Sequence, residues 1–476
     1  MHPKNYLKMK QFKTIILGAG VTGLYLGKTL LQNGEKSVLI LEKNDYVGGL
    51  CSSFNIDLNN EKYTLDYGPH KLFSLLPGIM EEFKSINGED NLTVKKINSL
   101  FFLDKKFQFP IKPAELIKNI NLKTTAAGIA IPLSLLKSIF IYNILRKKDD
   151  TFEDYLIKGF GKKAYNILFE SYAWKVWADP HILSKEIAEI RIPVPNIKDL
   201  LSKTVDKKSQ TAVNAKEFYY PKYGMQQLTG NIAHEFKKNN GKIHLKQNII
   251  SIDKKINKFI IRTNKETYSC ERLISTIPLS LLINLYKKST PEIKQITSKL
   301  KFNDLTLIHL FFNQPQIIKD NWIFFPELEY SFNRISEQKS FSPYTIPKDK
   351  TILCAEITNP KLNSLSDQEL IDLAINDLIK ANIISNNNTI FHKRILRIKN
   401  IYPIYDLNYK ENITQIIEFL DAENIITIGR YGLFNYNNSD HCLDMAQKCA
   451  EHLLKNTSKE KWNEERNSFF KYKIVD

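Results

Sequence analysis

The spacing of apolar residues near the start of the chain predicts a strand, a turn, a helix and a second strand. A short apolar run at residues 13–17 is followed at once by the sequence GAGVTG, and leucines then recur at helical spacing as far as Leu31. A second strand-like run covers residues 37–41 and ends at Glu42. This order of elements is typical of the βαβ unit that binds dinucleotides.

Farther along the chain the hydrophobic pattern changes. Apolar residues recur at spacings of three and four between about residues 113 and 201, which predicts a mainly helical block. From residue 242 onwards, strand-like runs with ordinary turn spacing predict an antiparallel series. A strand at residues 425–428 then leads into a Gly-Arg-Tyr-Gly turn and a helix that we expect Asp440 to cap. This last strand and helix should return to the nucleotide-binding unit.

The nucleotide-binding prediction depends on three glycines and one acidic residue. Gly18, Gly20 and Gly23 supply a tight turn, close approach of the backbone to a pyrophosphate, and close packing of the helix on the strand. The amide groups at the helix N-terminus would face the phosphates. Glu42 follows the glycines by about 20 residues, where a ribose-binding acid is expected. A glycine turn beside a surface glutamate is the weaker interpretation, because strand, helix and acid occur together.

Composition restricts the class of protein. A chain of 476 residues with 43% apolar and 25% charged residues fits one large two-lobed enzyme or two to three domains. The formal net charge of +17 favours anionic partners, although codon bias explains a lysine-rich surface equally well. We expect no nucleic-acid partner, since no binding motif or long basic tract occurs. Five scattered cysteines without CxxC spacing, and histidines without HExxH, indicate reduced thiols and no metal site.

Two apolar segments bear on location. The stretch before Gly18 is too short for the core of a signal peptide, so we expect a cytoplasmic protein. Residues 126–145 are apolar for about the length of a membrane span, but they include Pro132 and Lys137. We therefore favour a buried or interfacial helix pair there, with peripheral membrane contact as the alternative. The sequence does not indicate an oligomeric state.

The stretch EKNDYVGGL suggests which dinucleotide is bound, because it places Gly48 and Gly49 shortly after Glu42. This arrangement resembles the FAD-binding glutathione-reductase-like family, and within it the flavin amine oxidase superfamily, more than a nicotinamide dehydrogenase. The resemblance implies FAD as the resident cofactor. It also implies an α/β fold in which a discontinuous, Rossmann-like FAD-binding domain of glutathione-reductase type joins an α+β substrate domain of mixed helices and antiparallel sheet.

We accordingly predict that the FAD-binding domain is assembled from three separated parts. The predicted divisions are FAD-binding parts at residues 13–75, 216–278 and 401–456, a mainly helical substrate or cap region at 76–215, an antiparallel-sheet substrate region at 279–400, and a tail at 457–476.

Several separated segments are also similar to UDP-galactopyranose mutases, especially of the eukaryotic type, and more distantly to protoporphyrinogen oxidases. The segment SYAWKVWADP contains Trp174, RIPVPNIKDL begins at Arg191, and FNRISEQKSFSPY contains Arg334. The resemblance implies that the two arginines contact the diphosphate of the substrate, where guanidinium groups can bind in a bidentate manner. Trp174 could form part of the pocket wall, although packing of a helix is the favoured interpretation of its position.

Two further segments resemble turns that hold the flavin. GPH ends at His70 and resembles the loop beside the flavin, so His70 would hydrogen-bond the flavin or adjust its N5 face, with an ordinary turn histidine as the alternative. GRYGLFNYNNSDH resembles the closing flavin turn and brings Gly429, Arg430 and Asp440 to the cofactor. Phenol groups of Tyr402, Tyr405 and Tyr436 could bond phosphate oxygens, although core or surface packing is the favoured interpretation of any one among 22 tyrosines.

The resemblance implies reduced-flavin N5 chemistry on a nucleotide sugar, from pyranose to furanose, with NADPH or NADH as the reductant and cell-surface polysaccharide as the biological setting. The segment around Met225 also resembles the corresponding segments of protoporphyrinogen oxidases and phytoene desaturases, so the sequence does not identify the substrate. The alternative is an oxidoreductase of the amine oxidase or protoporphyrinogen oxidase type, in which a substrate hydride passes to the flavin. A third, non-enzymatic reading is a Rossmann-type binding protein that only retains the fold.

Overall fold

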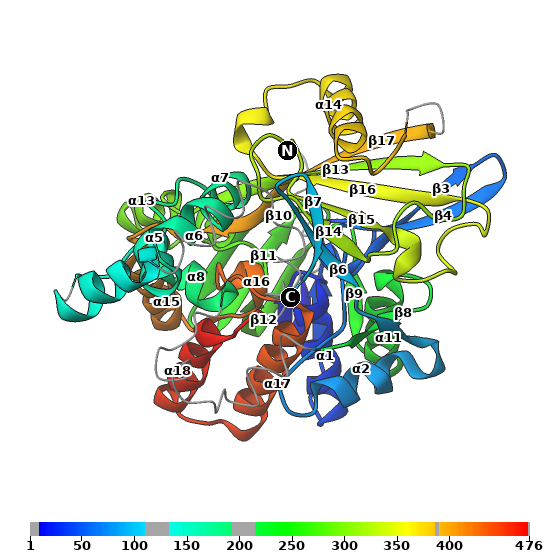
Figure 1. Cartoon of the computed structure of the whole chain (residues 1–476). Helices are drawn as coiled ribbons and strands as arrows, with labels where there is room; N and C mark the ends of the chain where they lie inside the picture. Colours follow the sequence, from blue (N-terminus) through cyan, green and yellow to red (C-terminus); the bar gives the residue numbers. More distant parts are fainter. Residues whose placement is uncertain (1–8, 110–132, 146, 193–214, 386–389, 475–476) are drawn as a thin grey trace.

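The computed structural model describes residues 9–109, 133–145, 147–192, 215–385 and 390–474. The strands of these residues form two seven-stranded sheets and two two-stranded sheets. One sheet lies near the centre of Figure 1, above helices α1 and α17, and the other extends toward the upper right, below helix α14.

The first sheet contains the predicted βαβ unit. Its strands run in the spatial order β10 (Ile249–Lys255), β11 (Lys258–Thr263), β12 (Thr267–Ser275), β1 (Lys10–Leu17), β2 (Val38–Leu41) and β9 (Lys242–His244), and β18 (Ile425–Thr427) also pairs with β12. β1 pairs in parallel with β2 and β12, and β12 pairs in parallel with β18. The predicted βαβ unit and the return of the last strand to it are therefore confirmed.

The antiparallel series expected from residue 242 is correct for β10, β11 and β12 but wrong for β9. β9 pairs in parallel with β2. The reason is topological, because helix α11 (Met225–Lys238) precedes β9 and returns the chain in the direction of β2, as a crossover helix does.

Helices close the core of this sheet. α1 (Val21–Gln32) follows β1 and packs against both α11 and α17 (Ser439–Lys455), as Figure 1 shows. Residues 14–17 of β1 and all of β2 are buried, which suits central parallel strands. The N-cap of α17 is Asn438 and not Asp440 as expected, because Asp440 lies inside the helix and accepts a hydrogen bond from the Ser74 hydroxyl at 2.9 Å.

The second sheet is built from strands of the middle and of both flanking parts of the chain. Its strands run in the order β17 (Ile390–Ile404), β13 (Lys301–Phe312), β16 (Thr351–Ile357), β15 (Arg334–Glu337), β14 (Trp322–Phe324), β6 (Asn98–Phe102) and β7 (Lys105–Gln108). Neighbouring strands are antiparallel except β14 and β6. Helix α14 (Asp367–Lys380), which starts with a capping box of Ser366 and Glu369, packs its apolar face into the same core as β13 and β14.

Among its described residues, the predicted mainly helical region 76–215 also contains strands, all of them before the stretch 113–201 that has the helical pattern. β6 and β7 lie within it, and so does β5 (Asn91–Lys95), which pairs with β8 (Glu217–Pro221). β5 and β6 find partners far along the chain, β8 and β14, which local spacing cannot reveal, whereas β7 pairs with its neighbour β6. The predicted helices are present as α5 (Phe152–Phe160), α6 (Lys162–Leu168), α7 (Glu170–Val176) and α8 (Lys185–Arg191). The parts of the predicted block at 113–132 and 193–201 lie outside the described residues.

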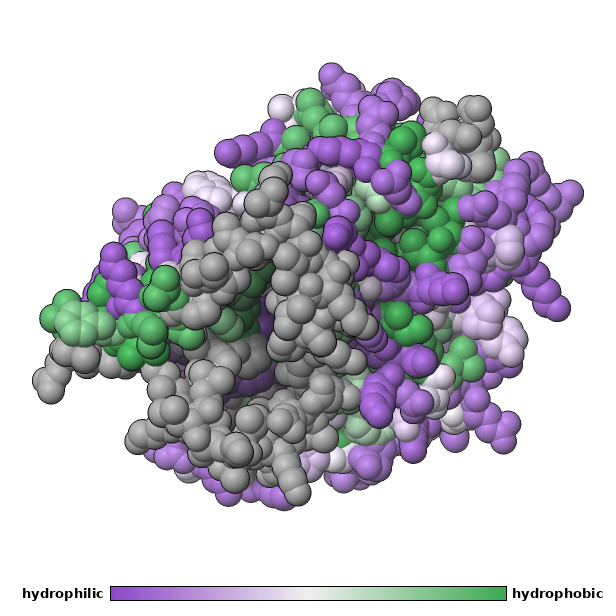
Figure 2. Space-filling model, viewed as in Figure 1, coloured by the Kyte–Doolittle hydropathy of each residue, from purple (hydrophilic) through white to green (hydrophobic). Residues whose placement is uncertain are grey.

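The apolar segment at 126–145 is described only from residue 133. Residues 133–139 are helical, and Phe140–Ile144 continues them as one π-helical turn at the left of Figure 1. Leu133, Leu136 and Phe140 are exposed on it, and Figure 2 shows hydrophobic residues at this end of the molecule. Among the described residues, no helix has the length and apolar character that crossing a membrane requires. Peripheral membrane contact stays a prediction.

The C-terminal segment is ordered secondary structure where a tail was expected. α18 (Lys459–Ser468) is followed by a 3-10 turn at Phe469–Lys471. Trp462 and Phe469 are buried, and Arg466 forms a two-point ion pair with Asp421 of α15 (Tyr409–Ala422) at 2.7 and 2.6 Å. Apolar burial and this ion pair hold the segment against α15.

Candidate cofactor and substrate site

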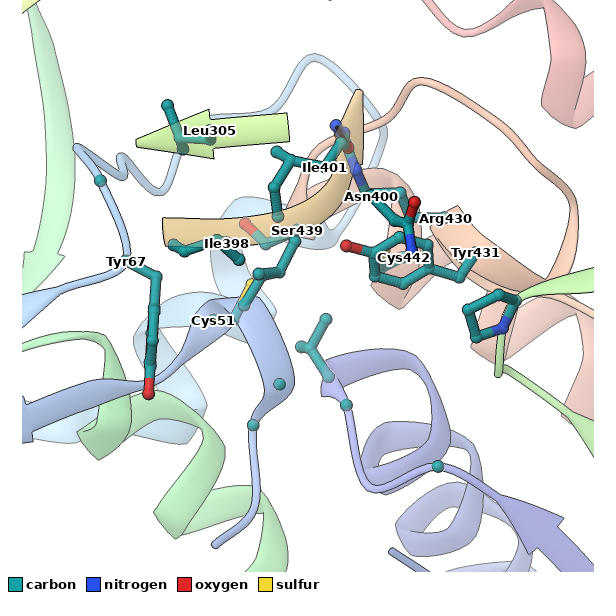
Figure 3. Close-up of a pocket in the computed structure, with 18 of the residues that line it drawn as sticks. Cys51, Tyr67, Leu305, Ile398, Asn400, Ile401, Arg430, Tyr431, Ser439 and Cys442 are labelled. Atoms are coloured by element: carbon teal, nitrogen blue, oxygen red, sulfur yellow. Dashed lines mark hydrogen bonds between the residues drawn. The ribbon is translucent and has the colours of Figure 1, made fainter. Parts of the chain in front are cut away.

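A cavity of about 520 Å³ lies where the carboxyl ends of the first sheet meet the second sheet. Ligand sites of this size are ordinary for cofactor-binding enzymes. Figure 3 shows how separate elements surround it: Arg430 and Tyr431 come from the closing turn, Ile398, Asn400 and Ile401 from β17, Ser439 and Cys442 from α17, and Tyr67 from the loop after β4 (Glu61–Asp66).

The glycine turn after β1 lies at one end of the cavity. Gly18 has a φ of 99°, and a Cβ on Gly23 would lie 2.2 Å from the Gly18 carbonyl oxygen, so both positions require glycine. A Cβ on Gly20 would meet no protein atom within 4 Å, although Gly20 lines the cavity. The turn thus leaves an open approach to its backbone where a pyrophosphate would lie. Gly23 itself does not line the cavity, and its role is packing.

The second glycine pair lies against the first turn. Gly48 donates from its amide to the Ala19 carbonyl at 2.8 Å and forms a bridge with Gly20. A Cβ on Gly49 would stand 3.6 Å from the Gly20 Cα. Both glycines line the cavity. The predicted close passage of a second chain segment beside the same cavity is therefore present.

Glu42 lines the cavity beside these turns. Its side chain is held by two backbone amides, since Oε2 accepts from Ala19 at 2.8 Å and Oε1 accepts from Asn44 at 2.9 Å. The residue is 8% exposed. The carboxylate is thus fixed at the end of β2, where it can accept hydrogen bonds from a ribose.

Two helix N-termini point amides toward the cavity, which is lined by Val21 and Thr22 of α1 and by Ser439 and Cys442 of α17. The first amides of a helix have no partner within the helix, and the helix dipole favours negative charge there. Asp440 does not line the cavity. Its contact with Ser74 is consistent with a supporting position behind the α17 N-terminus.

The closing turn joins β18 to α17 and touches both sheets. Arg430 donates from Nη1 to the Asn437 carbonyl at 2.7 Å and from Nη2 to the Ile401 carbonyl at 2.9 Å. Its buried Nε has no hydrogen-bond partner within the described part of the chain. Gly429 does not line the cavity, but a Cβ there would lie 2.8 Å from the Thr22 hydroxyl. Glycine thus permits the turn to pack against the start of α1.

The two arginines singled out from the sequence lie in the same cavity. Arg191 ends α8, and its guanidinium lies 5.2 Å from the ring centroid of Tyr436. Tyr436 stacks on Tyr402 at 5.6 Å, and Arg430 lies over both rings. Arg334 extends from β15 into the same space. Cationic groups and phenol groups therefore converge on one wall of the cavity.

Arg334 is held by Glu356, a residue that sequence reasoning missed. Nε and Nη2 of Arg334 donate to the two carboxylate oxygens at 2.5 and 2.8 Å. Burial disfavours the charged guanidinium, but the Glu356 carboxylate outweighs this and raises the pKa of Arg334 above its ordinary value. A single glutamate inside the otherwise apolar strand sequence TILCAEI was a usable signal for this pair.

His70 lies in the loop after β4 and lines the cavity. Its Nδ1 is 2.9 Å from the Gly68 carbonyl, so Nδ1 carries the proton in that contact. Burial lowers the pKa of His70 below 6.5, although the neighbouring Asp66 opposes this. Asp66, also missed from the sequence, accepts hydrogen bonds from the Ser53 hydroxyl at 2.6 Å, the Met225 amide at 3.1 Å and the Tyr220 hydroxyl. These contacts fix the start of the loop that carries His70.

Two predicted substrate residues lie outside the cavity lining. Tyr405 is buried, donates to the Asn435 side chain at 3.0 Å and accepts from the Tyr436 amide at 2.7 Å, so it supports the closing turn. Trp174 lies against Lys361, whose Nζ is 5.4 Å from its ring centroid. Tyr172 and Val176 of the same helix line the cavity instead, because residues four apart share one helix face.

Lys175, between those residues, is fully buried. Its Nζ donates to the carbonyls of Phe325, Glu327 and Phe332 at 2.8, 2.6 and 2.8 Å. Burial lowers the pKa of Lys175 to about 7. The lysine ties α7 to the loop that precedes β15, and so to the strand that carries Arg334. The described residues contain no cluster of His, Cys, Asp or Glu that could hold a metal ion.

Comparison with known proteins agrees with this geometry. Residues 21–392 match the family model of the flavin-containing amine oxidoreductases. The UDP-galactopyranose mutase of Mycoplasma pneumoniae (strain ATCC 29342 / M129 / Subtype 1) is 42% identical over 66 residues, which are 14% of this chain and 16% of that relative. The matched stretch thus spans less than a fifth of the relative.

Solved structures extend the likeness over nearly the whole chain. A crystal structure of reduced UDP-galactopyranose mutase superposes with a TM-score of 0.79 at 21% identity and covers 98% of both chains. A structure from Exiguobacterium sp. 255-15 assigned as a protoporphyrinogen oxidase gives a TM-score of 0.72 at 16% identity, covering 95% of this chain and 100% of that one. The predicted fold class, a discontinuous Rossmann-like FAD-binding domain with a substrate domain, is confirmed.

Proposed function

This chain belongs to the family of flavin-containing amine oxidoreductases and is an FAD-dependent mutase or oxidoreductase; we propose that it acts on a nucleotide sugar and converts a pyranose into a furanose, as its resemblance to UDP-galactopyranose mutases suggests. The observation that carries this proposal is the convergence of Arg191 and Arg334 on the cavity that the glycine turns also line.

The residues of the cavity fit FAD. The open backbone at Gly20 and the α1 N-terminus suit a pyrophosphate, and the fixed carboxylate of Glu42 suits a ribose. The α17 N-terminus suits the negative charge of a reduced flavin ring. Gly48 and Gly49 would allow close passage of the chain, and Arg430 would hold the turn that closes over the cofactor.

Reduced flavin, when bound, supplies a nucleophilic nitrogen, while the chain supplies position, charge and exclusion of water. Arg191 and Arg334 would hold the charge of the departing nucleoside diphosphate, because a guanidinium offers paired donors to phosphate oxygens. Glu356 uses Nε and Nη2 of Arg334, which leaves Nη1 for the substrate. Tyr402 and Tyr436 would donate hydrogen bonds from their phenol hydroxyls to the same phosphates, and His70 would be neutral beside the flavin.

A redox-neutral isomerisation requires the flavin to be reduced beforehand, so we propose NADPH or NADH as the reductant. The alternative function is a net oxidoreductase that passes a substrate hydride to the flavin. The family itself and the likeness to a structure assigned as a protoporphyrinogen oxidase favour this alternative.

The test begins with the absorbance spectrum of the FAD-loaded protein and its titration with UDP and UDP sugars. The proposal expects a saturable change in the flavin spectrum, and anaerobic formation of a furanose from UDP-galactopyranose by the dithionite-reduced protein, followed by chromatography. Absence of both would contradict it. Oxygen consumption with stoichiometric peroxide release on amines or tetrapyrroles, without furanose formation, would instead support the oxidoreductase.

A further inference from the structure

The last described residues of the chain contact two elements that meet at Arg191 and Tyr436. One is helix α8, which ends at Arg191, and the other is the turn that carries Tyr436. We name residues Phe469–Ile474 the C-terminal clamp. Within it Phe469, Tyr472 and Ile474 are buried, whereas Lys471 and Lys473 are exposed. The base of the clamp is fixed by α18, which the two-point ion pair of Arg466 with Asp421 holds on α15.

On one side, the clamp completes the C-terminus of α8. The last four carbonyls of a helix have no partner within the helix. The Ile474 amide donates to the Ile190 carbonyl at 2.8 Å, and Lys473 Nζ donates to the Glu189 carbonyl at 2.8 Å. A lysine ammonium also interacts favourably with the negative end of the helix dipole. These two carbonyls belong to the residues directly before Arg191.

On the other side, the clamp supports the closing turn. The Asn435 side-chain amide donates to the Phe469 carbonyl at 2.9 Å, and its oxygen accepts from the Tyr405 hydroxyl. That hydroxyl in turn accepts from the Tyr436 amide at 2.7 Å. The clamp is therefore linked through two side chains to the backbone of Tyr436, whose ring faces Arg191.

The clamp also stacks on the helix whose N-terminus faces the cavity. The Tyr472 ring lies parallel to the His441 ring at 4.6 Å, and its hydroxyl donates to Asp444. His441 Nδ1 accepts from the Asn438 amide at 3.2 Å, which fixes the start of α17. Burial lowers the pKa of His441, which suits a neutral ring that accepts at Nδ1.

We propose that the C-terminal clamp is a positioning element that holds Arg191 against Tyr436 for binding the diphosphate of the substrate, with Lys473 and Ile474 as its positioning residues; this rests on the proposed function. Without the clamp, two carbonyls of a seven-residue helix lose their partners, and the last residue of that helix, Arg191, gains freedom. An arginine that must be ordered on binding gives a weaker contact to the diphosphate.

The test uses three full-chain variants loaded with FAD. Ile474→Pro removes the amide donor to the Ile190 carbonyl, and Lys473→Met removes the ammonium while leaving the buried clamp residues in place. Lys471→Met is the matched control, because Lys471 is an exposed lysine of the same segment. The measurements are the Kd for UDP from the flavin absorbance, the Kd for FAD, and hydrogen exchange of peptides covering residues 185–192.

We expect Ile474→Pro and Lys473→Met to raise the Kd for UDP roughly three- to tenfold, about the loss of one hydrogen bond. In both clamp variants the Kd for FAD should stay within about twofold of the parent value. In the control Lys471→Met the Kd for UDP should also stay within about twofold. Arg191→Ala should weaken UDP binding at least as much, and combining it with either clamp variant should add nothing further, since both act through the same side chain. Hydrogen exchange at residues 185–192 should become faster in the clamp variants only.

Two outcomes overturn the clamp. The first is an unchanged Kd for UDP in FAD-loaded Ile474→Pro and Lys473→Met. The second is a combined variant whose loss of UDP affinity equals the loss from the clamp substitution plus the loss from Arg191→Ala. If Ile474→Pro does not fold, Lys473→Met decides, because its side chain is exposed. If the parent protein does not bind UDP, the proposed function fails. The clamp is then tested by hydrogen exchange at residues 185–192 alone. Equal exchange rates in the clamp variants and in Lys471→Met would reject it.

Discussion

Arg334 on β15 and Glu356 on β16 lie directly opposite each other in the antiparallel register and form a two-point ion pair in the wall of the cavity. The Glu356 side chain is 1% exposed and that of Arg334 is 19% exposed. The pair therefore holds the plane of the guanidinium in a nearly dry setting. A lysine at position 334 could balance the charge but could not reproduce this orientation.

We expect Glu356→Gln to lower the free energy of unfolding by about 2–3 kcal/mol, somewhat less than for a fully buried pair, because Arg334 keeps some access to solvent. The same change should weaken UDP binding, since the guanidinium loses its orientation. Urea unfolding of the FAD-loaded protein measures the first effect. Glu329→Gln is the control, because Glu329 pairs with Lys380 at an exposed site and should cost less than about 1 kcal/mol. Equal losses in both variants would contradict a special role for the buried pair.

Two glycines of the first turn should respond differently to alanine. Gly20→Ala should leave the Tm of the FAD-free protein unchanged and raise the Kd for FAD at least roughly tenfold, because its new methyl group meets no protein atom but would occupy the approach to the cofactor. Gly23→Ala should lower the Tm of the FAD-free protein, by overpacking worth about 1–3 kcal/mol, since its methyl group would overlap the Gly18 carbonyl. Tight FAD binding by Gly20→Ala would argue against the assigned cofactor position.

His70 should make stability depend on pH. Burial lowers its folded-state pKa below 6.5, so the unfolded chain binds the proton more readily, and the free energy of unfolding falls as the pH drops below about 6.5. We expect this fall between pH 7 and pH 5 to be shallower in His70→Asn than in the parent. Thermal unfolding across that range measures the difference. The contribution of the other histidines is the same in both proteins and does not affect the comparison. A steeper fall of the free energy of unfolding in His70→Asn would contradict a lowered pKa of His70 in the folded protein.

Lys175 should be needed for stability although its amino group is buried. Lys175→Met removes the donor of three backbone carbonyls, and we expect a loss of about 2–4 kcal/mol in the free energy of unfolding. Because burial lowers the pKa of Lys175 to about 7, the parent should lose stability relative to the variant as the pH falls from 9 to 6. Urea unfolding at both pH values tests this. A parallel pH response of the two proteins would show that Lys175 does not titrate in this range.

The parts of the fold that could be predicted from the sequence are those with local signals. The strand, the turn from Gly18 to Gly23 and the acid at Glu42 follow one another within about thirty residues, and backbone geometry requires glycine at Gly18 and Gly23. β9 and β6 could not be placed in the same way. β9 pairs with β2 and β6 pairs with β14, both far away in the sequence, and a three-residue strand such as β9 has no periodicity of its own.

The prediction of the substrate-binding residues depended more on resemblance to a family than on the hydrophobic pattern. Arg191 and Arg334 were chosen because their segments resemble a family, and nothing in their spacing shows that α8 and β15 meet. Glu356 and Asp66 were missed because a lone carboxylate in an apolar run usually has a structural role. The support of Arg191 by residues 469–474 was not foreseen either, since the final helix has a weak apolar pattern and was interpreted as a tail.

The choice between two aromatic residues of α7 provides a direct test of the site. Tyr172 lines the cavity and stacks edge-on with Phe324 at 6.4 Å, whereas Trp174 is two residues away, about 200° around the helix axis, and lies against Lys361. We expect Tyr172→Ala to raise the Kd for UDP sugars roughly three- to tenfold, the loss of one aromatic contact. Trp174→Ala should leave that Kd within about twofold and should cost only the cation–π contact, about 0.5–1 kcal/mol of stability. Titration of the flavin spectrum compares the two variants. A larger loss of affinity in Trp174→Ala would mean that the substrate approaches the helix from the other face, and that the cavity lined by Tyr172 is not where the sugar binds.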